Sequence, residues 1–342
     1  MVGEVITVTG ISGSGSRTFC QRYTSEKIKI YHTSDMTSIL AQDSQIPPIP
    51  KCNLHNLHPS ILADRVSYAY NLIKDDLPNA KSSNNKVFID THAQFFWNQA
   101  WTNTGYPLNL PVDMFVTIID KPSSIKDRQM QNEYGKTQTH DYRDLLFWQN
   151  LEVNITALWA KYTNKPHYVF SSKQNPDTID SLLENYFLVY SSFPMTDSES
   201  DNNKKIVNFK TRLRSLRREI DGKETPILDP ADVDIETDPA LADVVRETIS
   251  RQTVLRDLEW DIKKSTHVVA YYPDEKISLS KGVSDECTYA MQQAKFVYVI
   301  CPRKKISPFM EIAHKVFQDE EQFFSFFKKH MQDSLENYKR SG

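Results

Sequence analysis

The chain has 342 residues, 39% of them hydrophobic and 25% charged, and its formal net charge is −3. This length predicts about two domains, and this composition is typical of a globular protein with a proper core. The small negative charge provides no global basic field, so we expect no nucleic-acid partner.

The first half of the chain alternates short apolar runs with helical patterns. Runs rich in β-branched residues predict buried strands at 4–10, 86–91, 114–120 and 166–172. Amphipathic periodicity predicts helices at 61–77, 142–163 and 177–186. Alternation of this kind implies a parallel sheet covered on both faces.

A cluster of glycines follows the first predicted strand. Gly10, Gly13 and Gly15 lie within six residues of one another in a chain with only nine glycines. Glycines let a loop curl until its N–H groups point at one anion, and a following helix adds its dipole. This is the position of a phosphate-binding loop, and Gly10 and Gly15 have its spacing.

The residues after these glycines depart from the usual pattern of lysine followed by Ser or Thr. Ser16 stands where lysine belongs, and Arg17 and Thr18 follow. Ser16 or Thr18 could offer a hydroxyl to Mg²⁺, and Arg17 supplies a charge one residue late. Arginine does not simply replace that lysine, because its fork is wider and aims differently. Asp90, at the end of a buried strand, suits metal-bound water.

Three stretches of the first half resemble one enzyme family. GISGSGSRT, FIDTHAQFFW and GYPLNLPVDMFVTIIDKPSSIKDRQ are similar to archaeal-type adenylate kinases and related P-loop nucleoside monophosphate kinases. The resemblance implies a P-loop kinase-like domain over 1–185, with Arg128 as the arginine that opens the lid. The lid stretch, QNEYGKTQTHDYRD, is poor in arginine. Phosphoryl transfer depends on positioning and charge neutralisation, so weak or regulatory nucleotide binding is favoured over kinase activity. A retained fold without a ligand is the simpler alternative.

The second half alternates again. Strands are predicted at 186–192, 224–230, 266–273 and 295–302, and helices at about 206–220, 239–264 and 283–294, followed by an amphipathic C-terminal helix. The fold class is therefore α/β, with two tandem α/β domains that meet near residue 185. The second, 186–342, is smaller and Rossmann-like. The basic stretch 210–218 is read as a solvated helix face.

Two carboxylates of the second half are candidates for chemistry. Asp257, in the run RDLEW, precedes a strand, and Glu286 follows a polar loop on the first turn of the next helix. Both are expected at the carboxyl edge of the sheet, where open α/β sheets bind ligands. Two carboxylates at a cleft suit glycosidic chemistry, in which one attacks or stabilises the anomeric carbon and the other handles a proton. Ordinary helix charges are the alternative.

The same stretch resembles the nucleoside 2-deoxyribosyltransferase superfamily, and most of all the 2′-deoxynucleoside 5′-phosphate N-hydrolases. RDLEW is intact, and Ser280, Gly282 and Glu286 keep the spacing of the family's S-x-G-x-x-x-E motif. The resemblance implies that Glu286 is the nucleophile, Asp257 a proton donor or orienting group, and Ser280 a phosphate contact.

The opening strand of this domain supplies further candidates by the same resemblance. Tyr190, Ser191, Ser192 and Phe193 lie where the family contacts sugar and base, although the usual glycine is missing. The basic segment 303–307 is a candidate phosphate contact, which the partner in a homodimer or larger homo-oligomer could supply.

These features together predict an enzyme that cleaves the N-glycosidic bond of (deoxy)nucleoside monophosphates and carries an N-terminal nucleotide-binding domain. Cleavage needs no cofactor, and ATP with Mg²⁺ is the cofactor that the loop would take. The alternatives are a nucleoside monophosphate kinase with an accessory domain and a non-catalytic nucleotide sensor.

Cysteine usage and hydropathy bear on the compartment. The four cysteines show neither metal-ligand spacing nor a disulfide framework. No apolar stretch reaches the roughly 18 residues of a membrane helix, and no signal peptide is seen. A cytoplasmic protein without a membrane partner is expected.

Overall fold

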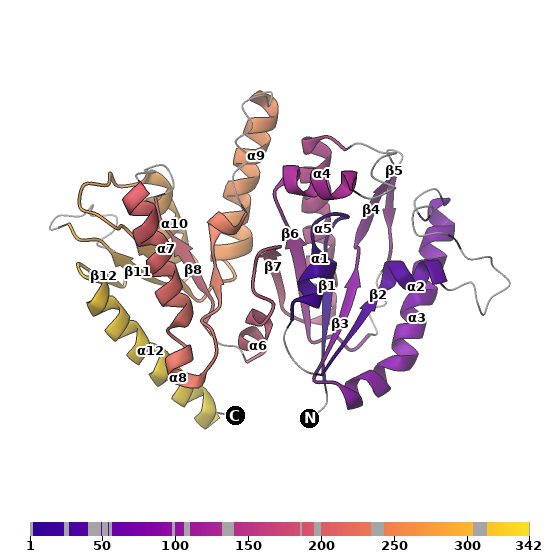
Figure 1. Cartoon of the computed structure of the whole chain (residues 1–342), viewed down its shortest axis with the longest axis horizontal. Helices are drawn as coiled ribbons and strands as arrows, with labels where there is room; N and C mark the ends of the chain where they lie inside the picture. Colours follow the sequence, from indigo (N-terminus) through magenta and orange to yellow (C-terminus); the bar gives the residue numbers. More distant parts are fainter. Residues whose placement is uncertain are drawn as a thin grey trace. The chain divides into compact units, whose positions relative to one another are not determined.

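The structure is a computed structural model of the chain, shown in Figure 1. It describes residues 3–23, 27–39, 49, 54, 57–97, 100–105, 110–131, 140–184, 187–194, 200–233, 243–303 and 313–341. These form two compact units, Met1–Pro176 with Asp232–Gln252, and Asp177–Ala231 with Thr253–Gly342. Each contains its own parallel sheet and covering helices, so the protein has the predicted α/β class with two tandem sheets. The domain boundary expected near residue 185 stays a prediction.

The first unit is built on a five-stranded parallel sheet of order β2-β3-β1-β6-β7 (Figure 1). Its strands are β1 (Glu4–Thr9), β2 (Ile28–His32), β3 (Lys86–Thr91), β6 (Met114–Ile119) and β7 (His167–Ser171). A small antiparallel hairpin of β4 (Gln94–Trp97) and β5 (Ala100–Asn103) follows β3. The strand β6 is buried along its whole length, as its continuous apolar sequence predicts for a central parallel strand.

The helices of the first unit are α1 (Ser16–Gln21), α2 (Thr33–Ile39), α3 (Pro59–Ser83), α4 (Pro122–Met130), α5 (Tyr142–Thr163) and most of α9 (Asp243–Leu255). The long helix α5 has clear ends. Its N-cap Asp141 accepts a hydrogen bond from the Asp144 N–H at 2.8 Å, and Asn164 ends it in the left-handed conformation with φ 54°.

The second unit has a five-stranded parallel sheet of order β12-β11-β10-β8-β9. Its strands are β8 (Val189–Ser192), β9 (Ile227–Leu228), β10 (His267–Tyr271), β11 (Phe296–Ile300) and β12 (Lys315–Phe317). Its helices are α6 (Thr178–Leu183), α7 (Ser200–Ser215), α8 (Arg218–Asp221), α10 (Lys281–Gln292) and α12 (Glu320–Ser341). Phe323, Phe324 and Phe327 of α12 pack with Phe209 of α7 in one hydrophobic cluster. Figure 1 shows both helices beside this sheet.

The helix predicted at 239–264 changes its geometry partway. After α9 the chain continues as a π-helix over Arg256–Ile262 and ends before β10. A π-helix is rare and is frequently found at functional sites. It lies in the run RDLEW, and Arg256, Asp257, Trp260, Asp261 and Ile262 are all buried there.

Candidate functional site

The glycine loop of the first unit joins β1 to α1. Gly13 and Gly15 have φ of 85° and 97°, a region that side chains rarely adopt. A Cβ on Gly13 would lie 2.8 Å from the backbone oxygen of Ile125. The loop therefore requires glycine for its shape, and α1 begins without a side-chain cap on its first N–H groups.

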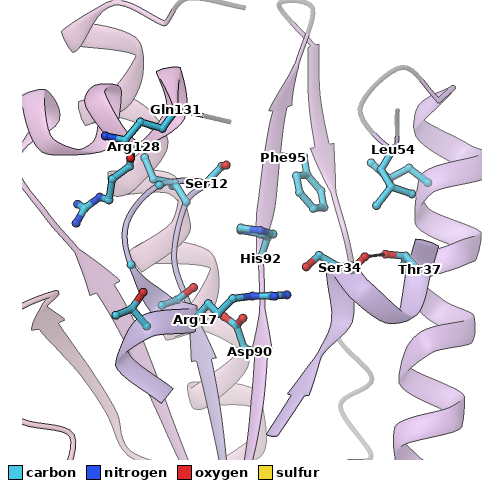
Figure 2. Close-up of a pocket in the computed structure, with 16 residues that line it drawn as sticks. Ser12, Arg17, Ser34, Thr37, Leu54, Asp90, His92, Phe95, Arg128 and Gln131 are labelled. Atoms are coloured by element: carbon cyan, nitrogen blue, oxygen red, sulfur yellow. Dashed lines mark hydrogen bonds between the residues drawn. The ribbon is translucent and has the colours of Figure 1, made fainter. Parts of the chain in front are cut away.

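A cavity of about 470 Å³ opens above this loop. That volume lies within the range of small-molecule sites. Arg128 and Gln131 lie at one end of it, and Phe95 and Leu54 at the other (Figure 2). The predicted nucleotide-binding residues that line it are Gly13, Gly15, Ser16, Arg17, Thr18, Asp90 and Arg128. Gly10 lies beneath the loop, where its N–H donates to Glu152 Oε1 at 3.1 Å.

The charged side chains of this cavity are already paired within the chain. Arg17 Nη2 lies 2.5 Å from Asp35 Oδ2, and Asp90 Oδ2 lies 2.7 Å from His32 Nδ1. Arg128 donates to Asp120. Figure 2 shows Arg17 reaching from α1 toward Ser34 on α2. A phosphate would therefore have to compete with Asp35 for Arg17.

Sequence reasoning missed Glu152, which organises the base of the loop. This fully buried carboxylate on α5 accepts the N–H groups of Gly10 at 3.1 Å, Ala93 at 2.7 Å and Gln94 at 2.9 Å. Burial raises its pKa to about 8, against the three backbone hydrogen bonds, which lower it. Glu152 joins the start of the loop to the end of β3. Its sequence context is that of an ordinary helix residue, so no local pattern marks it.

Glu286 lies at the carboxyl edge of the second sheet. Its Oε2 accepts a hydrogen bond from Ser192 Oγ, at the end of β8, at 2.5 Å. The chain leaves β8 toward β9 on one side and returns to β10 on the other, so this edge is the switch point where open α/β sheets bind ligands. The expectation that Glu286 occupies the first turn of its helix is wrong. The helix α10 begins at Lys281 because Ser280 caps it, and Glu286 falls in the second turn.

The environment of Glu286 holds its pKa near neutrality. Burial raises the pKa to about 7, the hydroxyls of Ser192 and Tyr190 lower it, and the charge of Asp257 raises it. The Tyr190 side chain is fully buried, and its hydroxyl forms no hydrogen bond of normal geometry within the described chain. A buried hydroxyl without a partner is rare, and its usual explanation is a water or a ligand.

Asp257 is held by its neighbour in the π-helix. Its Oδ1 lies 2.9 Å from Arg256 Nη2, and both side chains are buried. Arg256 also donates to the carbonyl of Pro230 at 3.3 Å. Burial raises the pKa of Asp257, and Arg256 acts against that shift. The structure thus brings Asp257, Glu286 and Tyr190 into one electrostatic neighbourhood.

Two other residues predicted for this site, Ser191 and Phe193, have different surroundings from Glu286. Ser191 alternates with Ser192 along β8 and so faces the opposite side of the sheet. Phe193 packs beneath Lys210, whose Nζ lies 4.5 Å from the ring centre.

Ser280 Oγ accepts the Val283 N–H as the helix cap, which uses a lone pair of this hydroxyl and not the proton expected to contact phosphate. Gly282 is exposed, and a Cβ there would make only ordinary contacts. Of the segment 303–307, residues 304–307 lie outside the described residues, as does most of the lid stretch (132–139).

Among the described residues, no three His, Cys, Asp or Glu side chains lie close enough together to hold a metal ion. None of the described helices combines the length and the hydropathy that a bilayer span requires.

Comparison with known families and curated sequences gives no match, whereas solved structures do match. No model of a known protein family matches the chain. No curated protein is similar to it in sequence.

Two solved structures illustrate the structural matches. An unliganded sugar kinase from Janibacter sp. HTCC2649 is 17% identical, with a TM-score of 0.29, and the match covers 54% of this chain and 91% of that one. A chain of the Pnkp1/Rnl/Hen1 RNA repair complex is 12% identical, with a TM-score of 0.28, over 93% of this chain and 96% of that one. At these TM-scores neither likeness transfers a fold or an activity to this protein.

Proposed function

We propose that the second unit cleaves the N-glycosidic bond of (deoxy)nucleoside monophosphates, with Glu286 as nucleophile. The observation that carries this proposal is the Glu286 carboxylate at the sheet's switch point, hydrogen-bonded to Ser192 and close to the Tyr190 hydroxyl, which forms no hydrogen bond of normal geometry in the described chain. A pKa of about 7 leaves a share of the Glu286 carboxyl groups ionised at neutral pH, and the ionised form is the one that attacks C1′ and the one that is released.

The proposed reaction has two balanced steps. An oxygen of Glu286 forms a bond to C1′ while the bond from C1′ to the base nitrogen breaks, and the base departs with a proton from solvent or an acid. Water, or a second base, then attacks C1′ and releases Glu286. The ion pair with Arg256 favours an orienting role for Asp257, because the guanidinium stabilises the charged carboxylate. Burial acts the other way and raises the pKa of Asp257, which keeps proton donation as the alternative role.

The first test follows release of free base by chromatography from a panel of deoxynucleoside and ribonucleoside monophosphates. Glu286→Gln keeps the shape of the side chain and removes the nucleophile, so we expect base release to fall below detection. Asp285→Asn is the matched control, since it changes the neighbouring, exposed carboxylate of the same helix. Base release by Glu286→Gln at the wild-type rate would falsify the assignment.

A second candidate function concerns the first unit, and it is nucleotide binding without turnover. The cavity above the loop supports it, because Gly13 and Gly15 line a space of suitable volume at the start of α1. The pairing of Arg17 with Asp35 argues against phosphoryl transfer by this unit.

Mg²⁺ fits this cavity poorly, because Asp90 is occupied by His32. Calorimetric titration with nucleotides, beside an assay for ADP, tests this candidate. We expect saturable binding and no ADP, and ADP formation would favour the alternative of a nucleoside monophosphate kinase.

A further inference from the structure

The outward face of α5 carries apolar residues where a surface helix normally carries charge. Phe147 and Leu158 are each 53% exposed, and Tyr162 is 76% exposed. Leu151 is half-buried and Asn154 is exposed. The spacing of four, three, four and four residues aligns all five on one side of the helix, opposite its buried face. We call these five residues the α5 stripe.

Charge is missing along the middle of this helix. Between Leu145 and Ala160 the sequence is LLFWQNLEVNITALWA, and its one charged residue, Glu152, is buried beneath the glycine loop. Exposed apolar residues scattered singly need no explanation, but a continuous row without charge marks an interaction surface. The ring of Trp101 packs edge-on against Phe147, with centroids 5.4 Å apart, and holds one end of the row in place.

The α5 stripe has the same order of residue types when it is read from either end. Reading inward, an aromatic residue is followed by a leucine, and Asn154 lies at the centre. When two such helices lie antiparallel across a two-fold axis at Asn154, Leu151 of one meets Leu158 of the other, and Phe147 meets Tyr162. Self-complementarity of this kind is what an isologous dimer interface requires. A central asparagine in an apolar helix seam commonly fixes register.

The ends of α5 favour the antiparallel arrangement. The cap and first turn, with Asp141, Arg143 and Asp144, are acidic on balance, whereas Lys161 lies in the last turn. Lys165 follows it and pairs with Asp113 at 3.8 Å. Antiparallel packing brings each acidic end beside a basic end, and it also opposes the helix dipoles. Parallel packing would place like charges together. We therefore propose that a second copy of this chain docks on the α5 stripe and forms a two-fold dimer.

The length of the α5 stripe sets the expected strength of this dimer. From Phe147 to Tyr162 it spans about 22 Å at 1.5 Å per residue. One helix pair of this length falls at the small end of specific interfaces, so we expect a dimer that dissociates on dilution.

Sedimentation of the full-length chain over a range of concentrations tests the proposal. We expect a mass that rises with concentration toward twice the 39.6 kDa of one chain. Leu158→Glu places a charge at the seam and should give the monomer throughout. Leu72→Glu, at an exposed leucine of α3, is the control and should behave as wild type. A wild-type chain that stays monomeric, or a Leu158→Glu chain that still dimerises, overturns the proposal.

A cysteine at the centre of the stripe tests the geometry by a second route. Asn154→Cys places the same residue of both copies at the axis, so mild oxidation should yield a covalent dimer. Val207→Cys, equally exposed on α7, should remain uncrosslinked under the same conditions. Circular dichroism of each variant establishes that it is folded. Equal crosslinking of both variants would show random collision and would count against a two-fold axis at Asn154.

Discussion

The cavity of the first unit and the second unit's site differ in how their central charged groups are held, although Asp257 of the second site is paired with Arg256. In the cavity, Arg17 forms an ion pair with Asp35, and Asp90 lies within hydrogen-bond distance of His32. At the second site, Glu286 is held by the neutral hydroxyl of Ser192, and the Tyr190 hydroxyl beside it forms no hydrogen bond of normal geometry in the described chain.

The two sites differ in how many charges and hydrogen-bonding groups a ligand could still engage. A charge that is already paired gains little from a ligand, because the new contact replaces an existing one. A buried hydroxyl without a partner gains the whole of a new hydrogen bond. The glycine loop is the more conspicuous feature of the sequence, yet the chemistry that we propose belongs to the second site.

After the loss of Glu286 itself, the largest expected effect is that of Asp257→Asn. The substitution removes a buried charge beside Glu286 and leaves Arg256 without its carboxylate. We expect base release to fall about 100-fold or more, in keeping with the contribution of positioned carboxylates. The measurement is kcat/KM for the best nucleotide of the panel.

Glu259→Gln serves as the control for this change, because Glu259 lies in the same π-helix and is bonded to Lys263 and Tyr289. A loss of the same size in the control would mean that the π-helix has been disturbed as a whole. Unchanged kinetics for Asp257→Asn would remove Asp257 from the proposed site.

The next effect is on the stability of the first unit. Glu152→Gln leaves one oxygen to serve three buried N–H groups, and each one that loses its acceptor costs roughly 1–3 kcal/mol. We expect a loss of about 3 kcal/mol in the free energy of unfolding, measured in urea, with base release by the second unit retained. A variant as stable as wild type would show that the loop does not depend on this carboxylate.

The stabilising contribution of Glu152 should also depend on pH. Burial raises the pKa of Glu152 from 4.5 to about 8, so the folded chain holds this proton more tightly than the unfolded chain. Its contribution to stability is therefore fully present below pH 4.5 and is lost as the pH rises toward 8. The difference in stability between wild type and Glu152→Gln should shrink over that interval.

Particular residues show how far the sequence predicts this molecule. The apolar runs of β1, β3, β6, β10 and β11 predict their strands, because continuous burial leaves a continuous apolar pattern. The short β2 and β12, the β4–β5 hairpin and the π-helix were not predicted, since tertiary pairing rather than local pattern decides them. The motif spacing locates Glu286, but the pairing of Arg17 with Asp35 and the role of Glu152 depend on long-range packing.

A smaller effect concerns the titration of Glu286. Attack requires the ionised carboxylate, so base release should rise with pH about a midpoint near 7. Ser192 donates to the charged form, and Ser192→Ala should move that midpoint upward by about one unit. The control, Ser191→Ala, lies on the other face of β8 and should leave the profile unchanged. If the midpoint of the Ser192→Ala profile is the same as in wild type, the group that titrates in the pH profile is not Glu286.

The smallest expected effect is on nucleotide binding in the cavity of the first unit, where the Arg17–Asp35 ion pair should weaken the affinity. Arg17 and Asp35 are 39% and 35% exposed, so their pair is worth less than about 1 kcal/mol. Asp35→Asn releases Arg17, and we expect nucleoside triphosphate to bind up to about fivefold more tightly, measured by calorimetry. Arg17→Met in the same background should cancel the gain. A gain of two orders of magnitude would instead show that one ion pair is all that separates this cavity from a strong nucleotide site. The contrast between the two units would then lie in regulation rather than in lost capacity.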